Sequence, residues 1–284
     1  MPELPEVETI RRGLDERLPG LVITGVEVRV PKLFEGDSES LVGRTVVSVE
    51  RQGKLLIIQL DAGWLLTIHL KMTGQLIWQG DEEIVGGHPE KAYLEPLPHK
   101  YTHVIFSFDD GSRLFFNDLR KFGRITVMRE EELSKTGFIE GLGPEPLEAD
   151  FTVAYLKEQL KIHGKTTIKS FLLDQHNIAG LGNIYADESL FRAAVMPSRQ
   201  AGTISSGEAQ NLFDGIQETL ELAILHGGST SRDYVNAAGE KGTYLAIANV
   251  YHRTGLLCNR CHDGLIQRKM IGGRSSHYCP ICQR

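Results

Sequence analysis

The chain has 284 residues, enough for two domains that each bury a core of their own. Its hydrophobic content of 41% and charged content of 24% are those of ordinary soluble globular proteins, and a net charge of −6 argues against a protein that binds polyanions over its whole surface. No apolar run approaches the roughly 20 residues of a membrane-spanning helix, and acids stand near the N-terminus where a secretory signal would carry basic residues. We therefore expect a cytoplasmic protein with no membrane partner.

The first part of the chain is predicted to form a helix followed by antiparallel strands. Apolar residues recur at helical spacing over residues 6–18, and short β-type runs begin after Pro19-Gly20. The segment 102–116 holds two strands joined at Asp110-Gly111, a typical hairpin turn. The other runs cover residues 22–28, 45–49, 55–58, 65–68 and 126–128. We expect an N-terminal antiparallel β-sandwich with flanking helices over residues 1–134, a barrel-like arrangement being the alternative.

The pattern changes to helical after a connector rich in glycine and proline, residues 135–150. Helices are predicted over residues 151–162, 166–174, 184–193 and 206–226, which gives a helical domain at 151–242. The last segment, 243–284, has too little apolar content to fold unaided. The predicted fold class is thus α+β with several domains.

All four cysteines stand in two close pairs near the C-terminus, Cys258-x2-Cys261 and Cys279-x2-Cys282. Four thiolates at this spacing bind one Zn²⁺ tetrahedrally, each pair supplied by a tight turn. Two disulfides are the alternative, and they are rare in a cytoplasmic protein. Because four protein ligands leave no open position on the metal, we expect one structural zinc ion and no cofactor for catalysis.

The segment between the cysteine pairs, residues 265–278, is typical of a β-hairpin that turns at Gly272-Gly273. Arg274 then lies at the tip, where zinc would make it rigid enough to enter a DNA groove. A solvated turn arginine is the ordinary alternative. From Tyr251 onward six basic residues accompany a single acid, Asp263, so this module is the positive end of the chain.

The opening run Met1-Pro2-Glu3-Leu4-Pro5-Glu6 offers a nucleophile. If Met1 is removed, Pro2 exposes a secondary amine whose pKa of about 8 leaves a usable fraction unprotonated at neutral pH. After attack on a sugar C1′, such an amine can open to a charged iminium without losing another proton, and the Glu3 carboxyl can exchange protons with the ring oxygen. The ordinary alternative is a helix start, with Pro5 in the first turn and acids at the positive helix end.

A glycine-rich turn, residues 179–183, separates two predicted helices. Asn183 stands where the N-cap of the second helix would be, and free backbone N–H groups at such a place can hold a phosphate. Gly180 and Gly182 permit close approach of the backbone. Glycine turns between helices also occur in proteins that bind no ligand.

Three separate segments resemble formamidopyrimidine-DNA glycosylases: residues 1–9, Gly182-Asn183-Ile184-Tyr185, and the run from Gly273-Arg274 to Gln283. The resemblance extends over essentially the whole chain. It implies a bacterial-type base-excision repair enzyme with a β-sandwich, a helix–two-turn–helix domain and a C-terminal zinc finger. It also implies removal of oxidised purines, chiefly 8-oxoguanine and formamidopyrimidines, from double-stranded DNA, and cleavage of abasic sites by a protein that acts as a monomer.

The resemblance implies the following roles at the catalytic positions. Pro2 is the Schiff-base nucleophile, and Glu3 is the acid that acts on the ribose ring oxygen. Glu6 is an accessory carboxylate that orders the N-terminal helix and its amine. Lys54, in the turn Arg51-Gln52-Gly53-Lys54, contacts a phosphate near the lesion, although a solvated turn lysine is the ordinary alternative.

The resemblance also implies the side chains that contact DNA. Three of them fill the gap that an extruded base leaves in the stack, where an aromatic ring can wedge between bases and an arginine can bond to the orphaned partner base. These are Met72, Arg120 and Phe122; without the resemblance, Met72 and Phe122 would be assigned to the core. The remaining expected contacts to phosphate come from Tyr101, Lys169, Asn183 and Arg274.

One further segment resembles the loop that closes over 8-oxoguanine. Its candidate residues are Ser229, Thr230, Arg232, Tyr234, Thr243 and Tyr244. The chain departs from the family pattern at Tyr101, where many relatives carry a histidine, and at Ser275-Ser276 after the finger arginine.

Two other functions remain open from the sequence. The related endonuclease VIII, which acts on oxidised pyrimidines, typically starts Pro-Glu-Gly-Pro-Glu, whereas Leu4 stands here. A non-catalytic zinc-ribbon protein that binds DNA on the same scaffold is the second alternative, and the presence of Pro2, Glu3 and Lys54 argues against it.

Overall fold

The computed structural model describes residues 1–80, 83–87, 96–229 and 243–284. The described chain divides into two compact units, Met1–Glu140 and a second made of Gly141–Ser229 with Thr243–Arg284. The division falls inside the expected connector at 135–150. Among the described residues, no helix combines the length and the apolar character that crossing a bilayer requires.

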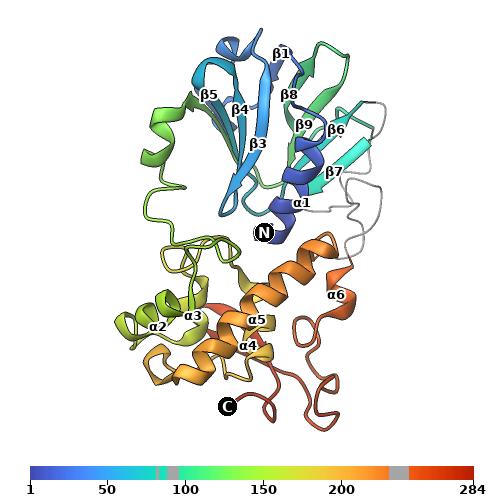
Figure 1. Ribbon diagram of the computed structural model, residues 1–284. Helices are drawn as coiled ribbons and strands as arrows, with labels where there is room; N and C mark the ends of the chain where they lie inside the picture. The colour runs from blue at the N-terminus through green and yellow to red at the C-terminus, as the bar shows by residue number, and fades with distance from the viewer. Residues whose placement is uncertain (81–82, 88–95, 230–242) are drawn as a thin grey trace. The chain divides into compact units, whose positions relative to one another are not determined.

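The first unit is a sandwich of two five-stranded sheets (Figure 1). One sheet has the order β1 (Ile23–Val28), β8 (Thr102–Phe108), β9 (Arg113–Asp118), β6 (Gly74–Gln79), β7 (Glu83–Gly87). The other has the order β2 (Phe34–Glu35), β10 (Arg124–Arg129), β5 (Trp64–His69), β4 (Leu55–Leu60), β3 (Val46–Gln52). All pairs are antiparallel except β2 with β10. The predicted antiparallel sandwich is confirmed; the barrel-like alternative is not what forms.

One apolar core joins both sheets and the N-terminal helix α1 (Leu4–Asp15). Val7, Ile10 and Leu14 of α1 are buried in it, and Leu18 follows in a turn and is buried as well. The helix begins earlier than the predicted residue 6 because Pro5 is tolerated in a first turn, where its missing N–H has no helical partner. The hairpin between β8 and β9 turns at Asp110-Gly111 as predicted, with a positive φ of 86° at Gly111.

The second unit is built on helices α2 (Val153–Ile162), α3 (Ile168–Leu173), α4 (Asn183–Arg192) and α5 (Ser206–Leu225). These match the four predicted helices within two residues at each end. Three begin at a hydroxyl N-cap that accepts a backbone N–H: Thr152 for α2, Thr167 for α3 and Ser205 for α5. A short helix α6 (Tyr244–Ile247) and a hairpin of β11 (Gln267–Ile271) and β12 (Arg274–Tyr278) complete the unit.

Candidate active site and metal centre

The N-terminal segment is packed into the protein rather than left in solvent. Pro2 is buried, and the side chains of Glu3 and Glu6 are 4% and 7% exposed. The Glu3 backbone N–H donates to Glu6 Oε2 over 2.8 Å. A carboxylate in the first turn thus fixes the peptide next to Pro2, which is the ordering role that the sequence analysis expected for Glu6.

The rest of α1 is held by Glu8, a residue that the sequence analysis did not assign. Its carboxylate accepts from Arg11 and Arg12 of the same helix and from Arg51 of β3. Burial raises the pKa of Glu8, but the hydrogen bonds from Arg11 and Arg12 outweigh it and lower the pKa overall. Arg51 and Glu8 therefore tie α1, which follows Pro2 and Glu3, to β3.

Arg51 also connects α1 to the turn that contains Lys54. Its side chain is only 9% exposed, and besides Glu8 it donates to the Gly53 carbonyl over 2.9 Å. Gly53 and Lys54 form the turn between β3 and β4, where Gly53 has a φ of 57°. One guanidinium therefore links the N-terminal helix to the turn of the half-buried Lys54. Nothing in the local pattern around Arg51 signals this role, since its partner lies 43 residues away.

A neutral histidine lies close to Lys54. Burial, and then the positive charges of Lys71 and Lys54, lower the pKa of His69 to about 3. Its Nδ1 accepts the Lys71 N–H over 3.0 Å, and its ring lies 4.7 Å from that of Phe138. His69 therefore stays uncharged at neutral pH, and Lys54 and Lys71 are the cations that act on it.

The three expected gap-filling residues lie on two turns of the first unit. Met72 is half-buried between β5 and β6, and Arg120 and Phe122 are exposed between β9 and β10. Phe122 is 53% exposed, and the Arg120 guanidinium lies 4.6 Å from the centre of its ring. Phe122 is therefore a surface residue and not part of the core.

Tyr101, the expected contact that departs from the family histidine, precedes β8 and is half-buried. Its N–H donates to His99 Nδ1 over 3.2 Å, and its carbonyl accepts the Asp118 N–H over 3.0 Å. The Lys100 ammonium lies 5.1 Å from the centre of its ring.

In the second unit, Asn183 is the first residue of α4 and Gly182 is the N-cap, one position from the expected cap. The Asn183 side-chain amide donates to the Ser275 carbonyl of β12 over 2.9 Å. Its own carbonyl accepts from Lys169 Nζ over 2.8 Å. Asn183 therefore connects the start of α4 to both α3 and the hairpin.

Lys169 occupies a different place from the one expected. Its side chain is fully buried, and its ammonium donates to Asp187 Oδ1 over 2.7 Å as well as to Asn183. A direct contact of this ammonium with a phosphate does not fit such burial. Asp187 Oδ2 accepts both the backbone N–H and Nδ1 of His277, in β12. The Lys169–Asp187–His277 network instead locks α3, α4 and the hairpin together.

The neighbouring acid, Glu188, holds the chain that leads into the cysteine module. Its fully buried carboxylate accepts the backbone N–H groups of Asn249, Val250 and Tyr251, at 2.8 to 2.9 Å, and the Asn249 side-chain amide. Three backbone donors on one carboxylate fix this segment as firmly as a helix cap does. Sequence reasoning assigned neither Asp187 nor Glu188.

The hairpin turns at Gly272-Gly273, as predicted, with φ angles of 57° and 73°. Positive φ at both central residues matches the right-handed twist of the flanking strands. A Cβ on Gly272 would come within 2.3 Å of Ser170 Oγ, so the tip lies closely against α3. Arg274 is exposed directly after this turn.

The four cysteine sulfurs lie within 4.8 Å of one another. The Cys258–Cys282 and Cys261–Cys279 Sγ–Sγ distances are 3.7 and 3.8 Å. A tetrahedron with Zn–S bonds of about 2.3 Å has edges of about 3.8 Å, whereas a disulfide needs about 2.05 Å. The arrangement is compatible with the expected zinc and not with the disulfide alternative.

The surroundings of the sulfurs also suit a metal. Backbone N–H groups of Gly264 and Asp263 lower the pKa of Cys261 to about 6, whereas burial and the neighbouring thiols raise the pKa of Cys282 to about 12. Four thiolates this close together need a cation to balance their charge.

The expected lesion-recognition loop is described only at its ends, since Thr230, Arg232 and Tyr234 lie outside the described residues. Ser229 is half-buried, and Thr243 bonds to His226 through both its N–H and its hydroxyl. Tyr244 is 2% exposed and packs edge-on against Tyr185 at 5.3 Å. Tyr244 is therefore a core residue of the second unit in this structure.

Two family models match the chain: the formamidopyrimidine-DNA glycosylase N-terminal domain over residues 1–125 and the H2TH domain of the same enzymes over residues 142–235. The chain belongs to the formamidopyrimidine-DNA glycosylase family. The glycosylase of Pelotomaculum thermopropionicum is 43% identical, with 100% of this chain and 99% of that protein covered. That of Geobacillus kaustophilus is 42% identical, with both chains covered completely.

Solved structures of formamidopyrimidine-DNA glycosylases agree over the full length. Lactococcus lactis Fpg in complex with DNA containing an abasic site has a TM-score of 0.88 at 32% identity, with 99% of each chain covered. The Thermus thermophilus protein has a TM-score of 0.85 at 36% identity, with 99% of this chain and 98% of that chain covered. The chain is accordingly a DNA glycosylase of DNA repair, and abasic-site lyase activity is characteristic of its family.

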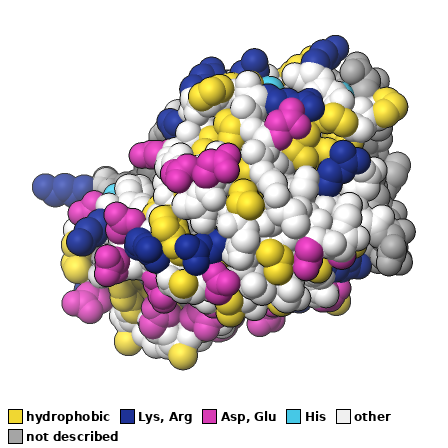
Figure 2. All heavy atoms as spheres, turned by 90° about the horizontal axis from the view of Figure 1, so that it is seen from above, with side chains coloured by type: hydrophobic (Ala, Val, Ile, Leu, Met, Phe, Trp, Pro, Cys, Tyr) yellow, Lys and Arg dark blue, Asp and Glu magenta, His cyan; other side chains and the backbone are white. Residues whose placement is uncertain are grey.

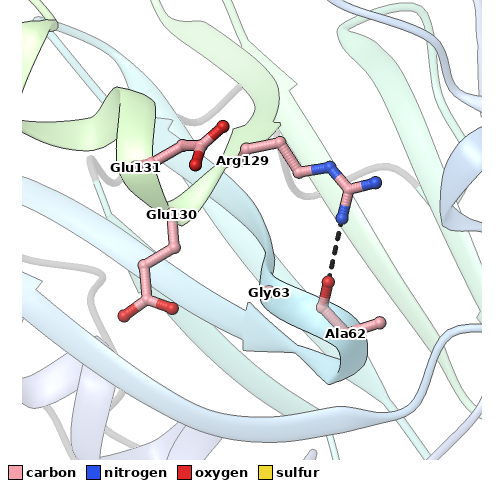
Figure 3. A pocket seen from close by; sticks show the side chains of 5 residues that line it. All are labelled: Ala62, Gly63, Arg129, Glu130 and Glu131. Carbon is pink, nitrogen blue, oxygen red and sulfur yellow. Dashed lines mark hydrogen bonds between the residues drawn. The ribbon is translucent and has the colours of Figure 1, made fainter.

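A hollow of about 630 Å³ lies elsewhere on the first unit, lined by Ala62, Gly63, Arg129, Glu130 and Glu131 (Figure 3). Arg129 donates to the Ala62 carbonyl over 2.9 Å and stacks on Trp64 at 4.0 Å. None of the expected glycosylase residues lines it, so it is not the candidate active site. On the face shown in Figure 2, lysines and arginines stand among acids rather than in a continuous basic surface.

Proposed function

We propose that the chain excises oxidised purines, chiefly 8-oxoguanine and formamidopyrimidines, from double-stranded DNA and then cuts the strand by β,δ-elimination. The proposal assigns the chemistry to the Pro2 amine, exposed by removal of Met1. The supporting observation is the N-terminal arrangement, in which Glu6 holds the peptide N–H beside Pro2 and Glu3 is 96% shielded from solvent. The Lactococcus lactis relative was solved with Fapy-dG DNA and with abasic-site DNA, which fits this substrate class.

The proposed reaction starts with attack of the uncharged Pro2 amine on C1′ of the damaged nucleoside. The C1′–N bond to the base breaks, and the base leaves with a proton. Glu3 donates a proton to the ring oxygen as the C1′–O bond opens, which gives a cationic Schiff base, an iminium, between the Pro2 nitrogen and C1′. The iminium acidifies the C2′ proton. Its removal expels the 3′ phosphate, and a second elimination expels the 5′ phosphate.

The four cysteines would hold one zinc ion that has no part in these steps. Four thiolates complete its tetrahedral shell, so no position remains for substrate or water. The ion would fix the hairpin and with it Arg274.

The DNA contacts proposed for the chain are shared between the two units. Lys54 and Tyr101 would contact phosphates, and Met72, Arg120 and Phe122 would fill the gap left by the extruded base. In the second unit, Asn183 and Arg274 would contact phosphates, whereas the buried Lys169 would position Asn183. Ser229, Thr230, Arg232, Tyr234 and Thr243 remain proposed parts of the lesion-recognition loop. We propose that the protein acts on DNA as a monomer, in the cytoplasm.

Covalent trapping tests the proposal. Borohydride should reduce the Schiff base and link the protein to a duplex carrying 8-oxoguanine opposite cytosine, and intact-mass measurement should show Pro2 as the first residue. Pro2→Gly should lose trapping and strand cutting, whereas Pro19→Gly, the same change at an exposed turn proline, should keep both. Undiminished strand cutting by Pro2→Gly, or active protein that retains Met1, would refute the mechanism. Faster cleavage at thymine glycol than at 8-oxoguanine would refute the substrate class.

A further inference from the structure

The turn that carries Arg120 and Phe122 is built around one buried carboxylate. Asp118, the last residue of β9, is fully buried, and its Oδ2 accepts the backbone N–H groups of Phe122 and Gly123 over 2.8 and 2.7 Å. Its Oδ1 accepts the Arg120 N–H over 3.1 Å. A charged acceptor that takes three backbone donors fixes the course of the turn far better than packing of exposed side chains could.

The same carboxylate reaches the turn that carries Met72. Thr73, which directly follows Met72, is 6% exposed, and its hydroxyl donates to Asp118 Oδ1 over 2.5 Å. The Thr73 oxygen also accepts the Arg120 N–H over 3.0 Å. The next residue, Gly74, pairs with Asp118 where β6 and β9 lie side by side. A single hydroxyl thus ties together the two turns that hold all three gap-filling residues.

The backbone leaves these turns little freedom to adopt another shape. A Cβ on Gly123 would come within 2.5 Å of Phe116 Cζ, and one on Gly74 within 2.4 Å of the Leu70 carbonyl. Lys121 has a φ of 56°, which a non-glycine residue adopts only when its surroundings impose it. Since Phe122 is more than half exposed, its position depends on this backbone and not on a core around the ring.

We propose that Thr73 and Asp118 are positioning residues that make Met72, Arg120 and Phe122 enter the duplex as one rigid set. The proposal rests on the function proposed above, in which these three side chains replace the extruded base. Arg120 then reaches the base opposite the lesion from a fixed position. The Thr73–Asp118 hydrogen bond therefore controls the preference of the enzyme for one opposite base over another. Both residues are buried, at 6% and 0% exposed, so the proposal gives them no contact with the sugar and no part in the chemistry at an already exposed abasic site.

Thr73→Val tests the proposal, because valine keeps the shape of threonine and removes the hydroxyl. Loss of a hydrogen bond to a charged group should slow single-turnover excision of 8-oxoguanine opposite cytosine by about tenfold. The preference for cytosine over adenine opposite the lesion should shrink by a similar factor. Fluorescence of 2-aminopurine opposite the lesion, which reports unstacking by the inserted side chains, should rise less on binding. Cleavage of an abasic site in single-stranded DNA should stay within about threefold of wild type.

Two variants separate positioning from general loss of stability. Thr73→Ser restores the hydroxyl and should restore the opposite-base preference. Thr67→Val removes another buried hydroxyl of the same unit, which donates to the Thr126 carbonyl, and should leave the preference unchanged. The inference is wrong if Thr73→Val keeps the wild-type preference and fluorescence change. A wild-type protein that neither excises 8-oxoguanine nor is trapped on it would instead refute the proposed function.

Discussion

Replacing Lys169 by methionine tests whether the buried network of the second unit is a structural joint. Methionine has nearly the length of lysine but no charge, so the cavity stays filled while Asp187 Oδ1 and the Asn183 carbonyl each lose a donor. Both side chains of the ion pair are fully buried, so water cannot replace the ammonium.

The expected loss of stability is large because an unpaired buried charge remains. Removing one partner of a buried ion pair costs about 3–5 kcal/mol, and the lower end applies here because His277 still donates twice to Asp187. With a urea dependence of about 3 kcal/mol per molar, the unfolding midpoint should fall by about 1 M.

Two probes can follow the units separately. Both tryptophans, Trp64 and Trp78, lie in the first unit, so their fluorescence reports that unit, whereas far-ultraviolet circular dichroism is dominated by the helices of the second. The dichroism midpoint should shift, and the fluorescence midpoint should move less. Lys165→Met, an exposed change four residues away, should shift neither by more than about 0.2 M. Equal dichroism midpoints for the two variants would show that the pair contributes nothing to stability.

Two further predictions concern metal retention by the four cysteines and the stability of the protein in acid. Glu188→Gln leaves one acceptor oxygen for three backbone donors, so a chelator should extract the proposed zinc ion about tenfold faster than from wild type. Glu218→Gln, on the exposed face of α5, is the control, and equal extraction rates for the two variants would contradict the role given to Glu188. The folded-state pKa of His69, about 3, lies below its unfolded value of about 6.5, so the unfolded chain binds more protons between these values and stability should be lost as pH falls from about 6.5 towards 3. His69→Asn, which keeps an acceptor for the Lys71 N–H, should show a shallower loss in denaturation midpoints measured across this range, and an unchanged slope would refute the assignment.

Features that depend on short stretches of chain could be predicted from the sequence. The four helices of the second unit, the turn at Gly272-Gly273 and the clustering of the cysteines each follow from residues near one another. Three strands of the first unit, β2, β6 and β7, were missed. β2 has only two residues, and so short a strand carries no alternation pattern.

Side-chain burial in the candidate site could not be predicted in the same way. Lys169 was expected at the surface, but its burial depends on Asp187, 18 residues further on, and through it on His277. Tyr244 was expected in a loop over the base, and its contact with Tyr185 placed it in a core. Phe122 is the reverse case, a residue that is exposed although its local sequence favours burial. Only the family resemblance pointed to the surface, because an aromatic residue near a strand usually packs inside.

The adjacent acids Asp187 and Glu188 of α4 point about 100° apart around the helix axis, and each receives a different part of the C-terminal module. Asp187 binds the hairpin at His277, and Glu188 binds the backbone of the segment that leads into the module. A graft of residues 249–284 onto a foreign helical scaffold would therefore come loose unless the recipient helix carried the same two consecutive carboxylates. The C-terminal module therefore depends on α4 for its structure and cannot be transferred by itself.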